Sequence, residues 1–374
     1  MRSKNKKLFS LILISLLFIF IGFMRVFFVE SAHFPDRSTT PKYSIDNLKL
    51  VADLDYPPAN LAVTDDGDVY FTFHPEGKPP YNLAKLVNGK ATSWPSKKAY
   101  QEAHLDLIQN AYSIRIDSKN HLWILDNKPT RLVEYDLNEN KFLTRYYFSK
   151  TEFGFMSHAN DFNISRDSKF IYISDDGLFN KKPGIIVYDI EKNVAWKRLE
   201  SHTTTKAAPY VPVVQDREMT AYGLFSINPG VDGITLSRDD QWLYYAPFSG
   251  DKLYRIPRDK ISNQTLADSD LEPFIESVSS KTMTDGMTTD ASGNIYLSDI
   301  EHSAIIRMSP QGKMKTLLKD KKLRWPDGFS FGEDDWLYVS CSSLHQVIGV
   351  LGQKQHAPFQ IYKFKTGINT IAGQ

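Results

Sequence analysis

The chain has 374 residues, and its 45 basic and 44 acidic side chains leave a formal net charge of +1. This balance argues against a nucleic-acid-binding protein, which would carry a strongly basic face. The single cysteine, Cys341, excludes an intrachain disulfide, and we interpret it as a small buried apolar residue within the strand pattern LYVSCSS.

The first 30 residues are predicted to be a signal anchor or a signal peptide rather than part of the fold. A basic flank precedes an apolar run from Leu8 to Met24, whose length lies between that of a signal-peptide core and that of a membrane-spanning helix. Glu30 occupies a poor position for cleavage, which favours an uncleaved anchor. The basic flank (Arg2, Lys4, Lys6 and Lys7) should stay in the cytoplasm and place the bulk of the chain outside it.

Residues 31–42 are rich in Pro, Ser and Thr and are predicted to be a linker. From residue 43 to residue 374 one phrase recurs, made of a strand, a tight polar turn and a second strand centred on an aromatic side chain. Self-similarity at about 40–50 residues per unit is typical of a β-propeller, so we predict an all-β, six-bladed domain. The six copies begin at Asn60, Tyr112, Ala159, Val231, Thr284 and Pro326.

Further strand patterns follow each phrase and complete the predicted blades. Examples are RLVEYDL from Arg131 and the outer strand KMKTLLK; only Lys97–Ile108 has a weak helical pattern. An early strand, Leu48–Leu54, is expected to pair with Phe359–Phe364 and close the ring, which removes an open sheet edge. One interval between blades is longer than the others because it contains Ser201–Pro229, interpreted as a long insertion that is either functional or a surface excursion.

Polar residues stand at the start of the inner strands, which converge on one mouth of a propeller channel. We predict a ligand-binding site there, made of Asn60, His158, Asn160, Asp161, Asp232, Asp285 and Asp327. Carboxylates that point at one axis repel one another unless a cation, bound water or a cationic ligand lies among them, and oxygen ligands suit a hard cation such as Ca²⁺ or Mg²⁺. The alternative is that the Asp-Gly pairs are only turn chemistry, as predicted for the second acidic set in the hairpin turns, such as Asp66-Gly67.

Known catalytic patterns are missing from the chain. It contains no HExxH, no paired-cysteine spacing, no nucleophile elbow and no phosphate-binding glycine loop. His158, two residues before Asn160, is a candidate general base or ligand-binding group, whereas His74 and His345 receive no role.

Several segments resemble the yellow/major royal jelly protein family. They include VYFTFHPEGKPPYNLAKLVNGKATSWPS, NDFNISRDSKFIYISDDG from Asn160, DGITLSRDDQWLYYAPFSGDKLYRIP from Asp232 and WPDGFSFGEDDWLYVSCSSLHQ from Trp325. The resemblance spans about Leu48 to Val347 and implies a six-bladed, extracytoplasmic propeller. Members of that family bind small molecules such as amines, and some insect members are linked to dopachrome conversion. If this chain is an enzyme of that kind, the resemblance implies a dopachrome-type tautomerase. The disulfides of the secreted insect members are absent here.

A more distant resemblance is to gluconolactonase/regucalcin-like propellers, carried by DGMTTDASGNIYLSDIEHSAIIRMSP. It implies a divalent metal held by Asp285 and by Asp232, the latter in place of that family's asparagine. The glutamate ligand of that family would fall near Asn60, where no carboxylate exists, so this chain departs from that family's complete metal site.

Three functions remain open from the sequence. The first is a monomeric, exported or membrane-anchored propeller that binds a small organic ligand and touches the membrane through its N-terminal segment only. The second is a metal-dependent lactonase or hydrolase, with Ca²⁺ as the expected cation. The third is a protein-interaction platform, because fold alone does not determine function.

Overall fold

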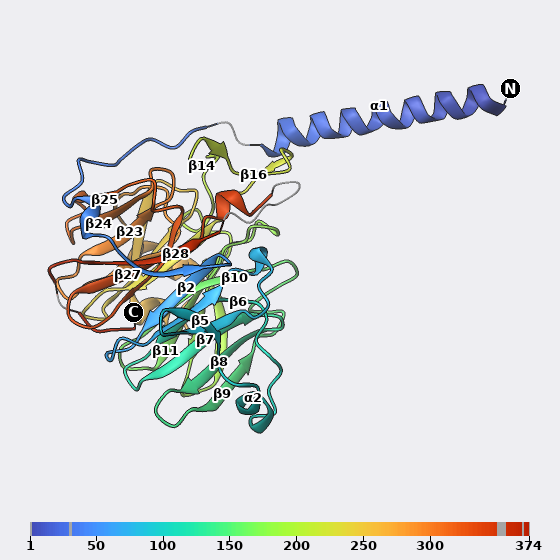
Figure 1. The fold of residues 1–374 in the computed structure, drawn as a ribbon. Coiled ribbons are helices and arrows are strands. Elements are labelled where there is room, and N and C mark those ends of the chain that lie inside the picture. The colour runs from blue at the N-terminus through green and yellow to red at the C-terminus, as the bar shows by residue number, and fades with distance from the viewer. Residues whose placement is uncertain (1, 30–31, 350–356, 369, 374) are drawn as a thin grey trace.

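The computed structural model describes residues 2–29, 32–349, 357–368 and 370–373. The first element, α1 (Arg2–Phe28), projects away from a β-propeller (Figure 1). Within α1 the stretch Phe9–Val26 is long and apolar enough to cross a membrane. Its length, composition and position fit either a signal anchor or a signal peptide, as predicted.

Six four-stranded antiparallel sheets form the blades, which confirms the predicted all-β propeller. Along each strand, apolar side chains either alternate with polar ones or are buried in succession, and tight turns separate the strands, as the recurring phrases predicted. From the inner to the outer strand, blade 1 is β2 (Pro58–Val63), β3 (Val69–Phe73), β4 (Leu83–Val87) and β5 (Lys90–Ser93). Blade 2 is β6 (Ala111–Ile116), β7 (His121–Asn127), β8 (Thr130–Asp136) and β9 (Lys141–Tyr147).

The next three blades follow the same order along the chain. Blade 3 is β10 (Ala159–Ile164), β11 (Phe170–Asp175), β12 (Gly184–Asp189) and β13 (Val194–Arg198). Blade 4 is β18 (Val231–Leu236), β19 (Trp242–Pro247), β20 (Lys252–Pro257) and β21 (Glu276–Ser280). Blade 5 is β22 (Met287–Thr289), β23 (Ile295–Asp299), β24 (Ala304–Met308) and β25 (Met314–Lys319).

Blade 6 is built from both ends of the propeller and closes the ring. It contains β26 (Pro326–Phe331), β27 (Trp336–Cys341), β28 (Phe359–Lys365) and, at its outer edge, β1 (Lys49–Leu54). β1 pairs antiparallel with β28, with Leu54 opposite Phe359 and Lys49 opposite Lys363. The predicted closure by an early strand is therefore confirmed.

Apolar clusters between neighbouring blades hold the ring together. One cluster joins blades 6 and 1 through Leu54, Phe71 and Phe359, and another joins blades 5 and 6 and includes Cys341. The aromatic residues at the centre of the second strands are all buried, as are the apolar residues around them. These six are Tyr70, Trp123, Tyr172, Tyr244, Tyr296 and Tyr338.

Helices are short outside α1. α2 (Lys97–Glu102) is capped by the Ser96 side chain and ends well before Ile108, because His104 adopts a positive φ of 49°. Two others, α3 (Arg258–Ile261) and α4 (Asp268–Leu271), lie between β20 and β21. Single 3₁₀ turns complete the described elements: η1 (Ile45–Asn47), η2 (Pro75–Gly77), η3 (Glu272–Phe274) and η4 (Leu344–Gln346).

A further apolar cluster covers one face of the ring and belongs to no blade. It combines Phe34 of the N-terminal segment with Val214, Met219 and Ile227 of the insertion and with Leu344 near the end of the chain. The insertion folds into two small hairpins, β14 (Val213–Val214) with β15 (Arg217–Glu218) and β16 (Thr220–Ala221) with β17 (Phe225–Ser226).

The described part of the segment predicted as a linker lies along the propeller. Ala32 forms a β-bridge with Tyr210, and the Lys42 and Tyr43 amides donate hydrogen bonds to blade 5 carbonyls. The chain that leaves α1 is thus held against the same face as the insertion.

Candidate functional site

Irregular register at the start of the inner strands directs the predicted site residues toward the channel. In β18, Val231 faces Pro247 but Ile234 faces Tyr245, so the ladder slips at Asp232 and Gly233. The same slip occurs at Asn60 in β2, Tyr112 in β6, Asn160-Asp161 in β10 and Asp327 in β26. A bulge of this kind turns side chains out of the sheet, and here it turns them toward the axis.

Buried hydroxyl groups of the second strands accept hydrogen bonds from backbone amides at the starts of the inner strands. The Asn60 amide donates to Thr72 Oγ1 at 3.1 Å, and the Asp161 amide donates to Ser174 Oγ at 3.0 Å. Ser298 Oγ accepts from both Asp285 and Gly286, at 3.0 and 3.1 Å. In blade 6, Ser340 Oγ accepts from the Gly328 amide at 2.9 Å. Each hydroxyl follows the central aromatic by two residues, so the second strand supports the site.

Replacing Ser298 by alanine is expected to lower the free energy of unfolding by about 2 kcal/mol, because two buried amides lose their acceptor. Denaturant unfolding of purified protein measures this loss. Ser277→Ala, on an exposed position of β21, is the matched control and should change stability little. Equal losses in the two variants would contradict the assigned role of the hydroxyl.

The Asp-Gly pairs of the last three blades are explained by close approach rather than by turn geometry. A Cβ on Gly233 would lie 2.9 Å from the Asp285 carbonyl oxygen, and one on Gly328 would lie 2.9 Å from Asn60 Cα. A Cβ on Gly286 would collide with the Asp327 carbonyl oxygen. None of the three glycines has a positive φ, whereas Gly67 and Gly293 of the hairpin turns do, at 82° and 76°. Glycine therefore lets neighbouring inner strands meet at the axis.

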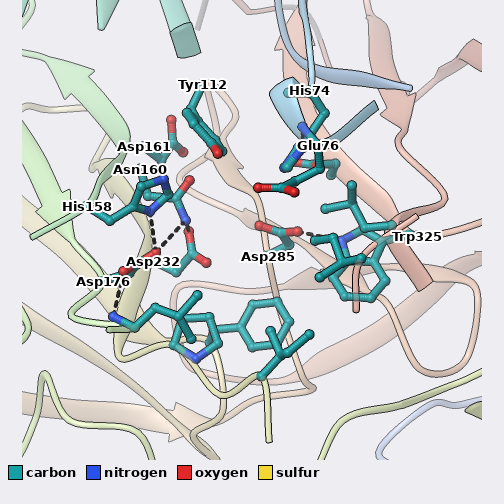
Figure 2. A pocket seen from close by; sticks show the side chains of 18 of the residues that line it. His74, Glu76, Tyr112, His158, Asn160, Asp161, Asp176, Asp232, Asp285 and Trp325 are labelled. Carbon is teal, nitrogen blue, oxygen red and sulfur yellow. Dashed lines mark hydrogen bonds and ion pairs between the residues drawn. The ribbon is translucent and has the colours of Figure 1, made fainter. Parts of the chain in front are cut away.

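All seven predicted site residues line one cavity of about 430 Å³ at the channel mouth. Figure 2 labels His158, Asn160, Asp161, Asp232 and Asp285 among them. The polar residues at the starts of the inner strands form one end of the cavity, called its floor, and loop residues form the walls between this floor and the entrance. Asp232 and Asp285, the two predicted metal ligands, both lie in it, and their role as ligands stays a prediction. Six of the described lining residues are acidic and none is Lys or Arg; the acids are Glu76, Asp161, Asp176, Asp232, Asp285 and Asp327.

Arg115 is buried beside the floor of the cavity and engages two of the predicted residues. Its guanidinium donates to Asn60 Oδ1 at 2.5 Å and to both carboxylate oxygens of Asp161 at 3.0 Å. Ser113 Oγ donates to Asp161 as well, at 2.5 Å. Asn60 and Asp161 thus have a structural partner, which leaves Asp232, Asp285 and Asp327 as the less compensated carboxylates.

On one side of the cavity a hydrogen-bonded chain runs from a histidine to a carboxylate (Figure 2). His158 Nδ1 lies 2.8 Å from Asp176 Oδ2, and Asn160 Nδ2 donates to Asp232 Oδ1 at 2.7 Å. Burial by itself would lower the pKa of His158, but the Asp176 carboxylate raises it above its usual range. The Asp176 carboxylate therefore favours the protonated form of the His158 ring.

The carboxyl groups of Asp232, Asp285 and Asp327 in the cavity have raised pKa values. Burial raises the pKa of Asp285 to about 7, although Trp325 Nε1 donates to its Oδ2 at 2.6 Å. Burial and the neighbouring Asp285 carboxylate also raise the pKa of both Asp232 and Asp327 well above the usual range. Removing water from several anions at one place is costly, so this group of carboxylates favours a bound cation.

Aromatic and apolar side chains form the walls. His74, Tyr112 and His158 stand edge to face, with ring centroids 5.1 and 4.5 Å apart. Burial lowers the pKa of His74 to about 3, so this ring is neutral and adds no positive charge. Trp325 and Phe248 stack on the opposite side. The insertion contributes Ala221, Tyr222, Phe225, Ile227 and Pro229, which favours the functional interpretation of this long segment.

Sequence reasoning missed several residues of the cavity. Arg115 had a recognisable signal, a charge in the middle of an apolar inner strand, and the supporting hydroxyls had a fixed offset from the aromatic residues. Glu76, Asp176 and Trp325 lie outside the phrase positions, in loops that only the closed ring brings to the mouth. His74, for which the sequence predicts no role, also lines the cavity.

Two groups of described residues have three metal-ligand atoms within 4.8 Å of one another, and both lie outside this cavity. They are Asp36, Asp299 and His302, beside the N-terminal segment, and Asp117, His121 and Glu134 in blade 2. In the cavity itself the oxygen-rich donor set of Asp232, Asp285 and Asp327 fits a hard cation such as Ca²⁺ in its chemistry.

Comparison with known proteins agrees with the fold and the order of the motifs. The sequence model of the family described as Major royal jelly protein matches residues 109–367, which is more than half of the chain. The chain belongs to the major royal jelly protein family. Two honeybee (Apis mellifera) relatives are similar to it: major royal jelly protein 7, 28% identical over 165 residues, and major royal jelly protein 3, 23% identical over 248 residues.

The matched regions cover 40% and 60% of this chain and 35% and 44% of those two relatives. The chain thus spans less than half the length of the curated relatives it matches. Family membership confirms the first predicted resemblance, but the activities and partners of the relatives do not follow from it.

Solved structures confirm the second resemblance at the level of fold. A luciferin-regenerating enzyme aligns with a TM-score of 0.58 at 12% identity, covering 87% of this chain and 97% of that one. A gluconolactonase from Xanthomonas campestris gives 0.56 at 10% identity, covering 90% and 97%. Regucalcin from Agrobacterium tumefaciens, described as a calcium-binding protein, gives 0.54 at 14% identity, covering 86% and 94%.

Proposed function

We propose that this member of the major royal jelly protein family binds a small organic cation, such as an amine, in its central cavity. This proposal rests on the charge of the cavity lining. The described lining residues include six carboxylates and no lysine or arginine, and the ring of His158 is already paired with Asp176. A ligand with one positive charge would relieve the repulsion among Asp232, Asp285 and Asp327.

The shape of the cavity supports an organic cation rather than a bare ion. Aromatic rings of Tyr112, Phe248 and Trp325 stand around the carboxylates, and such rings attract cations through their faces. A volume of about 430 Å³ lies within the range of small-molecule sites, which combine apolar walls with a few polar groups.

The second candidate is a divalent-metal-dependent lactonase or related hydrolase. The described calcium binding of the regucalcin neighbour and the carboxylate oxygen donors of Asp232 and Asp285 in the cavity favour it. These residues would hold the ion, and the ion would polarise a lactone carbonyl. Against this proposal, Asn60 stands where the third ligand is expected, and its side-chain oxygen accepts from Arg115.

We also propose that the propeller lies outside the cytoplasm, because the basic residues that precede Phe9–Val26 favour the cytoplasmic side.

Binding of a fixed cation tests the function. Calorimetric titration of the purified full chain with phenyltrimethylammonium should show saturable binding, and its neutral isostere tert-butylbenzene should not bind. The positive charge is the only large difference between the two probes, so the comparison isolates the role of the carboxylates. Asp232→Asn should weaken binding at least tenfold, which corresponds to about 1.4 kcal/mol.

Asp259→Asn is the matched control, because Asp259 is an exposed carboxylate whose side chain is 72% accessible. Equal affinity for the charged and neutral probes would contradict the proposal. Saturable binding of CaCl₂ that is lost in Asp232→Asn, without binding of the organic cation, would favour the metal-dependent alternative.

A further inference from the structure

Exposed apolar side chains surround one side of the cavity mouth. We call this set the collar: Phe155, Met156, Phe179, Tyr222 and Phe225, with exposed fractions of 88%, 48%, 55%, 60% and 38%. Phe179, Tyr222 and Phe225 also line the cavity itself. The collar is therefore part of the entrance rather than a scatter of unrelated surface residues.

Hydrogen bonds between the loops make the collar continuous. Asn180 Nδ2 donates to the Phe155 carbonyl at 3.3 Å, which joins the loop before blade 3 to the loop after β11. Lys181 Nζ donates to Asn228 Oδ1 at 3.1 Å and thereby reaches the insertion. The β16–β17 hairpin of that insertion then carries Tyr222 and Phe225 of the collar.

The apolar helix ends at this same place. The described end of α1 contacts β17, the strand that begins with Phe225, and Figure 1 shows the helix leaving the propeller beside the hairpin of β16. Within Phe9–Val26, Met24 in the last turn is the residue that is partly shielded from solvent. Phe34, only eight residues after Val26, is buried under the insertion.

We propose that the collar rests in the headgroup region of the bilayer that α1 crosses, so that the cavity opens at the membrane surface. The last turn of an apolar span lies at the membrane–water interface, and Figure 1 shows this end of the helix beside the β16–β17 hairpin. Aromatic side chains favour this depth because their rings are apolar and their edges are polar. Lys181 and Lys182, which follow Phe179 and are exposed, suit anionic headgroups.

This proposal adds a second membrane contact to the one predicted from the sequence, which was confined to the N-terminal segment. The bilayer is preferred to a protein partner because the short connection between α1 and Phe34 limits how far the collar can lie from the membrane. Eight extended residues span at most about 28 Å. The orientation does not depend on what the cavity binds.

Site-directed spin labelling of the full chain tests the proposal. Cys341, the native cysteine, is fully buried and should remain unlabelled, so single substitutions provide unique sites. Phe155→Cys, Phe179→Cys and Tyr222→Cys place a nitroxide on the collar. Leu143→Cys and Val87→Cys place it on exposed apolar positions of other blades, 42% and 45% accessible, as matched controls. Phe18→Cys in α1 reports the membrane interior.

The protein is reconstituted into vesicles of phosphatidylcholine and phosphatidylglycerol, and the accessibility of each label to oxygen and to a water-soluble nickel chelate is measured. The ratio of oxygen to nickel accessibility should be several-fold higher on the collar than at Leu143 and Val87, and lower than at Phe18. Collar labels as accessible to nickel as the controls would overturn the proposal. Collar labels shielded from both reagents would also overturn it, in favour of a protein interface.

Discussion

Replacing Asp285 by asparagine is expected to stabilise the folded protein at pH 8 and, at the same time, to weaken its binding of a cation. Asp285 is buried among other carboxylates, and its pKa rises from 3.8 to about 7. That difference corresponds to about 4 kcal/mol lost from the free energy of unfolding once the group is ionised. Asparagine keeps an oxygen that accepts from Trp325 but carries no charge.

The sign of the pH dependence follows from the direction of the pKa change. A carboxyl group with a raised pKa in the folded state contributes its full stability below pH 3.8, and this contribution is lost as the pH rises through about 7. The stability difference between Asp285→Asn and the unsubstituted protein should therefore be near zero at pH 4 and reach about 2–4 kcal/mol at pH 8. Cation affinity of the unsubstituted protein should rise over the same range.

Urea unfolding at several pH values, with and without phenyltrimethylammonium, measures both effects. His74, whose pKa of about 3 makes the folded state less stable as the pH falls below 6.5, is present in both proteins and cancels in the difference. Asp259→Asn should show no such pH-dependent difference. A variant that is less stable than the unsubstituted protein at pH 8 would show that Asp285 is compensated in the folded state.

Placing a charge at the inward position of the closing strand is expected to abolish cooperative folding. Ala52 in β1 is 4% exposed and packs in the cluster that joins blades 6 and 1. An unpaired aspartate there costs several kcal/mol, which is comparable to the total stability of about 5–15 kcal/mol of most domains. Loss of β1 would also expose the edge of β28.

Thermal unfolding followed by circular dichroism compares Ala52→Asp with Leu50→Asp, a position on the same strand that is 54% exposed. Leu50→Asp should retain a cooperative transition close to that of the unsubstituted protein. A chain that begins at Ser44 keeps β1, and one that begins at Tyr56 lacks it, so only the first should fold. A cooperative transition in Ala52→Asp would mean that the propeller folds without a correctly packed β1, and would contradict the role of β1 in closing the ring.

The seven predicted site residues could be found from the sequence because each is marked by its position beside an inner strand. Each begins or adjoins an inner strand, and a propeller places the starts of these strands around one axis, so Asn160, Asp232 and Asp327 meet despite their distance in the sequence. The position of these residues beside the inner strands does not show which carboxylates are paired with a cation. Only the structure separates Asp161, which is paired with Arg115, from Asp285, which is not.

The role of the Asp-Gly pairs also became clear only from the tertiary structure. The dipeptide has two common causes, and the sequence cannot distinguish a positive φ from a close approach of two strands. Gly67 has the first and Gly233 the second, although both follow an aspartate. The distinction matters because it places Gly233, Gly286 and Gly328 at the axis and beside the site.

The sequence by itself determined the number of blades, the closing strand, the apolar N-terminal helix and the ring of polar residues at the inner strands. These features depend on patterns within a few residues: alternation, turn residues and a fixed offset from the central aromatic. The tertiary structure decided the acidity of the cavity and the nature of its entrance. Both depend on groups far apart in the chain, because burial and neighbouring charges set a pKa, and because the insertion, the loop of Phe179 and the end of α1 meet only when the ring is closed.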